Sequence, residues 1–176
     1  PGWSAVGNLD VNGDGKSDLL WRNESGQIET WIMDGATLTR AAGFSLPAGY
    51  RVMTTGDFNG DGFADLLLRN TSRDLLMWFG TGTTFNGQSL GRVFGAGWQA
   101  VSQLDIDGDG KSDLIWRNDS TGQIETWIMN GSLLVQATGF NLPAGHKIYS
   151  FGDFNGDSLA DILLTSSSRE LLMWFG

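Results

Sequence analysis

The sequence predicts an all-β fold, and three observations support that prediction. Short apolar runs rich in Ile, Leu, Trp and Phe alternate with segments rich in Gly, Asn, Asp and Ser, as strands alternate with turns. No long glycine-free window shows the 3.6-residue period of an amphipathic helix. The whole pattern also recurs at a fixed period, which is typical of proteins built from repeated units.

The repeat is marked by four acidic segments with the pattern D-x-[DN]-x-D-[GS]-x-x-D. They begin at Asp10, Asp57, Asp105 and Asp153. The first and third repeats share KSDL and GQIETWIM, whereas the second and fourth share GDFNGD and LLMWFG. A pair of repeats is therefore the unit of the more recent duplication. We expect one propeller or half-propeller domain over residues 1–176, with repeats at 3–50, 51–97, 98–146 and 147–176.

Each repeat is predicted to form several short strands, placed in the first repeat near 3–9, 18–23, 27–33 and 37–44. In the segment LLMWFG both alternating faces are apolar: Leu75, Met77 and Phe79 lie on one face, Leu76 and Trp78 on the other. Such a strand must be covered on both sides. Four-stranded antiparallel sheets stacked around an axis provide this cover, so we predict a β-propeller of about four blades rather than a flat sandwich.

The last blade is expected to be incomplete. The second repeat continues past Gly80 with a plausible outer strand, whereas the fourth ends at the equivalent Gly176. This pattern is compatible with three arrangements: a ring that closes with a three-stranded last blade, a ring completed by a second chain, or a piece of a longer repeat protein. The pairwise period favours a homodimer that forms an eight-bladed ring, with a self-closed four-bladed ring as the alternative.

Charge and composition exclude several functions. With 20 acidic and 11 basic residues the net charge is −9, which disfavours binding to nucleic acid. The chain has no Cys and one His, so Cys-based and multi-His metal sites are excluded within a single chain. No apolar run reaches the length that a membrane-spanning helix needs, so no membrane span is expected.

The acidic segments are predicted to bind Ca²⁺, a hard cation that takes oxygen ligands. Carboxylates packed this closely repel one another unless a cation lies among them. Three or four ions are expected per chain. Each site would use the side chains of loop positions 1, 3, 5 and 9 and the carbonyl of position 7: Asp10, Asn12, Asp14, Lys16 and Asp18; Asp57, Asn59, Asp61, Phe63 and Asp65; Asp105, Asp107, Asp109, Lys111 and Asp113; Asp153, Asn155, Asp157, Leu159 and Asp161.

Two details refine this prediction. An EF-hand needs a Glu at loop position 12, where these loops carry Trp or Leu, so an EF-hand is excluded. Gly15, Gly62 and Gly110 occupy a sharp turn that suits a positive φ, and the fourth loop has Ser158 there. We expect the third site, with four carboxylates, to bind most tightly and the fourth to be the weakest or empty.

Function is open to three interpretations. The first is a non-catalytic, calcium-stabilised scaffold or interaction module. The second is a carbohydrate-binding propeller that uses Trp21, Arg22, Trp116 and Arg117, although recurring Trp residues also suit core packing. The third is a glycan-active enzyme; His146 has no marked nucleophile, and the equivalent Glu29 and Glu125 suit salt bridges or a solvated strand face better than catalysis, so we expect no enzyme.

The acidic loops, the strand after each loop, and the connectors Phe94–Gly97 and Leu46–Gly49 resemble FG-GAP/VCBS repeats, the calcium-loop repeats of integrin alpha-chain propellers and many secreted bacterial proteins. The resemblance covers essentially the whole chain. It implies a propeller whose calcium loop joins the first two strands of a blade, a secreted or cell-surface location, and an adhesion or ligand-binding role with a protein or glycan partner. Ser158 and the incomplete last repeat depart from the family pattern.

Overall fold

The fold is described by a computed structural model that covers residues 2–93 and 95–176. The chain consists of two compact units, residues 1–95 and residues 96–176. The described residues form strands, turns and bends, and no helix occurs among them. The all-β prediction is confirmed.

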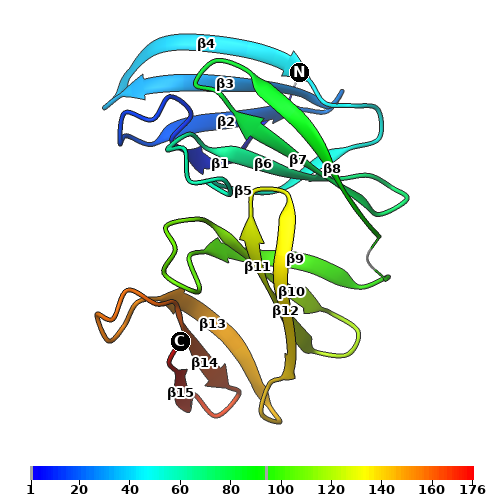
Figure 1. The fold of residues 1–176 in the computed structure, drawn as a ribbon, viewed down its shortest axis with the longest axis vertical. Helices are drawn as coiled ribbons and strands as arrows, with labels where there is room; N and C mark the ends of the chain where they lie inside the picture. The colour runs from blue at the N-terminus through cyan, green and yellow to red at the C-terminus, as the bar shows by residue number, and fades with distance from the viewer. Residues whose placement is uncertain (1, 94) are drawn as a thin grey trace. The chain divides into compact units, whose positions relative to one another are not determined.

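The first unit contains two four-stranded antiparallel sheets, each ordered as in the sequence (Figure 1). The predicted strands of the first repeat agree with the observed ones to within a residue. The first sheet contains β1 (Trp3–Leu9), β2 (Asp18–Asn23), β3 (Gln27–Asp34) and β4 (Thr37–Ser45), and the second contains β5 (Arg51–Gly56), β6 (Asp65–Arg69), β7 (Asp74–Gly80) and β8 (Phe85–Val93).

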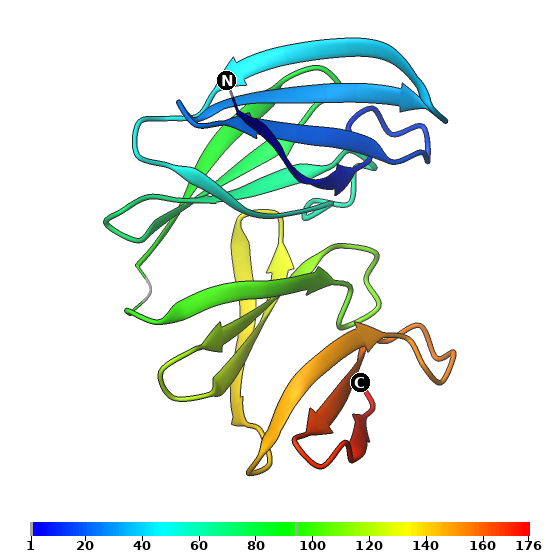
Figure 2. The ribbon, with the colours of Figure 1, turned by 180° about the vertical axis from the view of Figure 1, so that it is seen from behind.

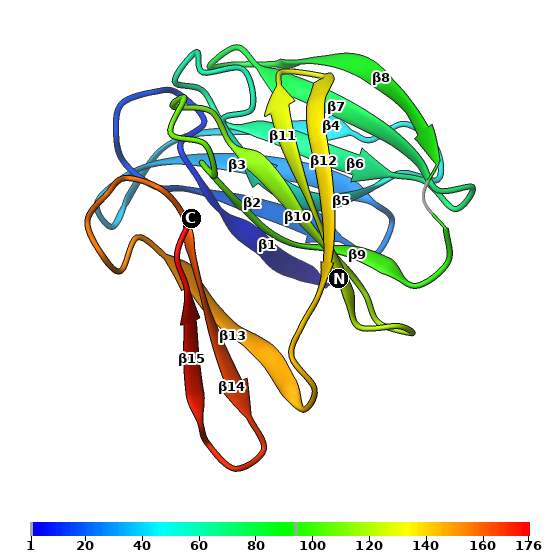
Figure 3. The same cartoon turned by 60° about the horizontal axis from the view of Figure 1, so that its bottom comes forward.

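The second unit contains one four-stranded and one three-stranded antiparallel sheet, which can also be followed from behind in Figure 2. Strand β15 forms one edge of the three-stranded sheet (Figure 3). The blade-like sheets of a propeller and the incomplete last blade are thus confirmed. The strands are β9 (Trp98–Leu104), β10 (Asp113–Asn118), β11 (Gln123–Asn130) and β12 (Leu133–Asn141), then β13 (His146–Gly152), β14 (Asp161–Ser166) and β15 (Leu171–Trp174).

The core of the first unit lies between its two sheets. Leu20 and Ile28 of the first sheet pack in one cluster with Leu66 and Leu68 of the second, and all four side chains are buried. Strand β6 is buried along its whole length. In β7, for which two covered faces were predicted, Leu75, Met77 and Gly80 are buried and the other residues are partly buried. Burial of such side chains contributes about 1.5–3 kcal/mol each, so this packing fixes the ends of the strands from which the acidic loops extend.

Candidate metal centre

Each acidic loop joins the first two strands of its sheet. The loops lie between β1 and β2, β5 and β6, β9 and β10, and β13 and β14. In every sheet this first strand pair also contains one register shift, between Ala5 and Gly7 in the first sheet and at related places in the others. The four loops are therefore four copies of one local structure, held at the same position of each blade.

The first aspartate organises the backbone of its loop. In the first loop Asp10 Oδ1 accepts the backbone N–H of Gly13 at 2.8 Å, and Oδ2 accepts that of Gly15 at 2.7 Å. The other three loops contain the same two bonds, with distances of 2.6–3.0 Å. The backbone of the loop thus curls around the first carboxylate. This curvature turns loop positions 3 and 5 toward the same side of the loop.

The third loop places three carboxylates around one point. Oxygens of Asp105, Asp107 and Asp109 lie within 4.8 Å of one another, and these side chains form the one such acidic group found among the described residues. Lys111 Nζ lies 2.7 Å from Asp109 and offsets part of their charge. A set of carboxylate oxygens this close suits a hard divalent cation, which would replace like-charge repulsion with attraction.

The remaining loops have an amide where the third loop has its middle carboxylate. Asn12 Nδ2 donates to Asp14 at 3.2 Å, and Asn59 and Asn155 make the same bond to Asp61 and Asp157 at 2.9 and 2.8 Å. The amide oxygen of each Asn accepts the backbone N–H of the position 5 aspartate. These loops therefore hold the predicted side chains of positions 1, 3 and 5 in one local network with a smaller negative charge.

The ninth-position aspartates have a structural role that the sequence analysis did not predict. Asp18, Asp65, Asp113 and Asp161 are each 0% exposed. One oxygen of Asp65 accepts the backbone N–H of Phe58 at 2.8 Å and the other accepts that of Gly80 at 2.9 Å. The other three aspartates make the equivalent pair of bonds. Each therefore links the start of its loop to the third strand of the sheet or the residues just after it.

Burial makes two of these carboxylates unusually hard to ionise. Desolvation raises the pKa of Asp65 to about 7, with smaller contributions from the charges of Asp61 and Asp57. Desolvation likewise raises the pKa of Asp113 to about 6. In contrast, hydrogen bonds from Lys111 lower the pKa of Asp109. The position 7 carbonyls of Lys16, Phe63, Lys111 and Leu159, and the ninth-position carboxylates, remain predicted ligands.

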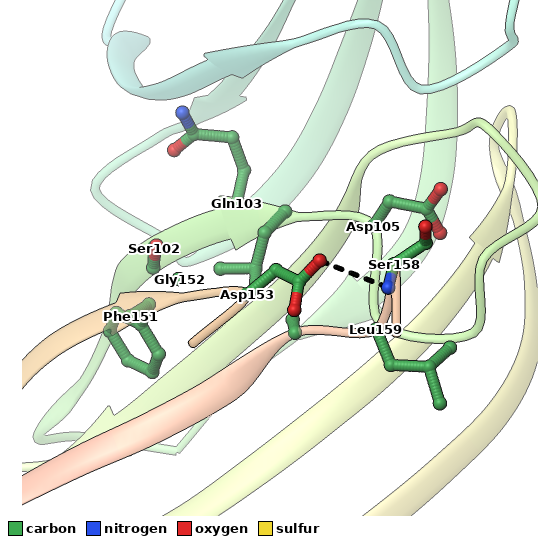
Figure 4. A pocket seen from close by; sticks show the side chains of 10 residues that line it. Ser102, Gln103, Asp105, Phe151, Gly152, Asp153, Ser158 and Leu159 are labelled. Carbon is green, nitrogen blue, oxygen red and sulfur yellow. Dashed lines mark hydrogen bonds between the residues drawn. The ribbon is translucent and has the colours of Figure 1, made fainter. Parts of the chain in front are cut away.

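The turn glycines adopt the conformation that the sequence analysis expected. Gly15, Gly62 and Gly110 have φ of 79°, 84° and 83°. Ser158 occupies the same place in the fourth loop with φ of 70°, which is unfavourable for a residue with a side chain. Its backbone N–H still donates to Asp153, at 3.0 Å (Figure 4). The fourth loop thus keeps the shape of the others at a cost in backbone strain.

Neighbouring loops within a unit lie close together. In the first unit the backbone N–H of Ala64 donates to the carbonyl of Asp10 at 2.7 Å, so the second loop is joined to the first. In the second unit a hollow of about 250 Å³ is lined by Asp105, Asp153, Ser158 and Leu159, which belong to the third and fourth loops (Figure 4). The acidic loops of one unit therefore form a pair.

The tryptophans proposed for sugar binding pack against other tryptophans. The rings of Trp21 and Trp31 are 5.2 Å apart, those of Trp116 and Trp127 are 5.3 Å apart, and Trp116 is 0% exposed. This packing favours a core role for these two rings. Arg22 and Arg117 are both half-buried, and Arg117 pairs with Asp119 at 2.7 Å.

The two glutamates considered as catalytic groups each accept a hydrogen bond from a tryptophan. Trp31 Nε1 donates to Glu29 at 2.8 Å, and Trp127 Nε1 donates to Glu125 at 2.6 Å. Each pair lies on one strand, two residues apart, so both side chains face the same side of the sheet. These bonds give both glutamates a structural partner within their own blade, although the sequence analysis expected salt bridges or a solvated strand face.

A second hollow, of about 400 Å³, lies between the β10–β11 turn and the connector that precedes β13. Arg117, Asn118, Asp119, His146 and Lys147 are among the residues that line it. Arg117 is thus the one residue of the four proposed for ligand binding that lines this hollow. Its lining combines charged and polar groups of both signs with apolar residues such as Leu142 and Ile148, as ligand sites do.

Comparison with known families identifies the repeats. The profile described as FG-GAP-like repeat matches three overlapping stretches, 10–68, 57–116 and 105–164. Each match begins at the first aspartate of one loop and ends in the strand after the next loop. No curated protein matches the chain. Within the described residues no helix is suited to crossing a membrane. Because the matched stretches together extend from residue 10 to residue 164, the chain belongs to the FG-GAP-like repeat family.

Proposed function

We propose that this protein is a non-catalytic interaction module whose acidic loops bind calcium, three to four ions per chain, in an extracellular setting. The observation that carries the proposal is the convergence of Asp105, Asp107 and Asp109 in a loop whose backbone path recurs in all four blades. Ca²⁺ takes six to eight oxygen ligands, and these loops offer carboxylate and amide oxygens around one centre.

Calcium would act chiefly on stability. The formal charge of −9 would become −1 with four Ca²⁺ bound, so the ions would remove most of the self-repulsion of the folded chain. Each bound ion stabilises the folded state by mass action, and extracellular modules bind with Kd of about 10⁻⁴–10⁻³ M, which suits high external calcium. Loops ordered in this way would present a fixed surface to a protein or glycan partner.

A homodimer is part of the same proposal. The two units of one chain contribute four blade-like sheets, and a second chain would bring the number to eight. Sedimentation velocity in calcium distinguishes the alternatives, because a chain that remains monomeric at all concentrations would rule out the two-chain ring.

Carbohydrate binding is the second candidate function. The observation that favours it is the 400 Å³ hollow, where Arg117 and Lys147 lie beside the amides of Asn118 and Asn141. Such groups hydrogen-bond hydroxyl and carboxylate groups of sugars. A glycan array probed in calcium buffer tests this function, and Arg117→Ala should abolish any signal that arises from this hollow.

The calcium proposal is tested by thermal unfolding with calcium and with EDTA. We expect the midpoint temperature to rise with calcium concentration. Asp107→Asn should lower the calcium dependence, because it converts the most acidic loop to the amide-containing type. Asp119→Asn is the matched control, since Asp119 is an exposed carboxylate outside the loops. A midpoint that is the same in calcium and in EDTA would refute the proposal.

A further inference from the structure

The two ends of the first unit carry opposite charges. Its acidic loops join β1 to β2 and β5 to β6, whereas the β2–β3 turn, the β4–β5 connector and the β6–β7 turn lie at the other end of the strands (Figure 1). Arg22, Arg51 and Arg69 lie at strand ends beside these connections, and Arg73 lies in the β6–β7 turn. This arginine end, in an acidic chain, is a surface suited to anions.

Two of these arginines are direct neighbours across a strand pair. Arg51 of β5 lies opposite Arg69 of β6, and like charges in such a position destabilise a sheet. Arg69 is buried, and desolvation lowers the pKa of its guanidinium, with smaller contributions from the charges of Arg51 and Arg73. The second unit has Lys147 opposite Thr165 at the same place, so this concentration of charge belongs to the first unit.

Arg73 holds a backbone conformation that costs free energy. Its φ is 73°, and it takes the place that Gly26, with φ of 81°, fills in the β2–β3 turn. The two turns close with the same backbone hydrogen bond, from Arg73 to Asn70 and from Gly26 to Asn23, each at 3.0 Å. Glycine would adopt this geometry without strain. An arginine held in a strained conformation points to a function of its side chain.

Three arginines of this end are open to a ligand. Arg51 is exposed, Arg22 and Arg73 are half-buried, and none of the three forms an ion pair with a residue that the structure describes. In the second unit Arg117, the equivalent of Arg22, pairs with a carboxylate at 2.7 Å. Arg22 lacks such a partner, and its Nε is buried without a hydrogen bond. Arg117 and Lys147 line one hollow, so Arg22 and Arg51 occupy the matching corner of the first unit.

We propose that the arginine end of the first unit binds the carboxylates of an acidic polysaccharide. Arg22, Arg51 and Arg73 donate the hydrogen bonds, and the planar guanidinium suits paired bonds to a carboxylate. The buried Arg69 adds its positive charge. An acidic polysaccharide carries at most one carboxylate on each sugar ring, which a few arginines can match, whereas duplex DNA carries a charge about every 1.7 Å.

The inference rests on carbohydrate binding as a function of the chain, and it names the class of sugar and a second surface. The arginine end lies in the first unit, whereas the 400 Å³ hollow with Arg117 lies in the second. A glycan signal that Arg117→Ala abolishes would therefore support that hollow even if the arginine end binds nothing. The two failures are thus distinguishable.

The probe is tri-galacturonic acid, titrated into the whole chain in millimolar calcium and followed by the NMR signals of the arginine Nε–H groups. The matched control ligand is the same trisaccharide with its carboxylates methyl-esterified. We expect the signals of Arg51 and Arg73 to shift with the acid, and the binding to weaken as the salt concentration rises. The ester should bind at least about ten-fold more weakly, because it loses the charge-assisted hydrogen bonds.

Two glycine variants separate binding from folding. Arg73→Gly removes a guanidinium and relieves backbone strain, so its urea midpoint should not fall, while its affinity for the acid should fall at least about ten-fold. Arg169→Gly relieves the same strain in the second unit, where φ is 66°, and should leave the affinity unchanged. Arg51→Gln, at an exposed site, should weaken binding as Arg73→Gly does.

Several results would overturn the proposal. They are an unchanged affinity in Arg73→Gly, equal binding of the acid and the ester, and NMR shifts confined to arginines of the second unit. Tighter binding of triglutamate or of a short DNA strand than of the trisaccharide would show that this end takes another class of anion, and would also overturn it.

Discussion

The pH dependence of stability gives a sharp test of how the buried aspartates behave. Asp65 has an ordinary pKa of 3.8 and a pKa of about 7 in the folded protein. A carboxyl group that keeps its proton longer when folded makes the folded state bind more protons than the unfolded state. Stability without metal therefore falls as the pH rises from about 4 to about 7. The perturbation is the Asp65→Asn variant, which keeps the size of the side chain and removes this titration.

The magnitude follows from the difference in pKa. About three pKa units, at about 1.4 kcal/mol per unit, set an upper limit of about 4 kcal/mol for the loss of stability between pH 4 and pH 8. Urea unfolding in EDTA at several pH values measures this loss. We expect the free energy of unfolding of the Asp65→Asn variant to depend less on pH, by up to that amount.

Calcium should oppose this dependence. The ion binds ionised carboxylates and would take the place of the proton among Asp57, Asp61 and Asp65, so the stabilisation by calcium should grow as the pH rises. An Asp65→Asn variant with the same pH dependence as the parent protein would refute the assignment of the titration to Asp65. A calcium effect that is equal at pH 5 and pH 8 would refute the link between the ion and these carboxylates.

Two further predictions concern the backbone of the loops and strands. Ser158→Gly should stabilise the protein by about 1 kcal/mol in urea unfolding, because glycine adopts the observed φ of 70° without a steric penalty. Gly110→Ser, the reverse change in the third loop, should destabilise the protein by a similar amount. Unchanged stability in either variant would contradict the argument. Gly80→Ala should destabilise by roughly 1–3 kcal/mol, because its Cβ would overlap the carbonyl of Ala64. Gly7→Ala is the milder comparison, because a Cβ built there meets no atom within 4 Å. An unchanged urea midpoint for Gly80→Ala would show that the backbone shifts at little cost.

Much of the fold could be predicted from the sequence because the signals were local and repeated four times. The strands of the first repeat follow from the alternation of apolar runs and turn residues, and the observed strands agree to within a residue. Glycine at the turn of three loops indicated a positive φ. Because the fourth loop has Ser158 at this position, the comparison also indicated where the backbone is strained. The missing outer strand of the last blade was visible because the second repeat supplied the comparison.

Other features depend on contacts that no local pattern encodes. The ninth-position aspartates were predicted as ligands, yet Asp113 also bonds the backbone N–H groups of Ile106 and Met129, and the second of these is distant in sequence. All four are fully buried, and each accepts a hydrogen bond from the third strand of its sheet or from the residues just after it. The bond between Trp127 and Glu125 was also missed, although a Glu two residues before a Trp on one strand is a signal that can be recognised.

The most direct test of the account is a count of calcium ions. Equilibrium dialysis against millimolar calcium, followed by elemental analysis, measures the number bound per chain. The account predicts three to four ions in the parent protein and a loss of about one when Asp105, Asp107 and Asp109 are changed together to Asn. A chain that binds no calcium under these conditions would contradict the claim that these acidic loops are metal sites.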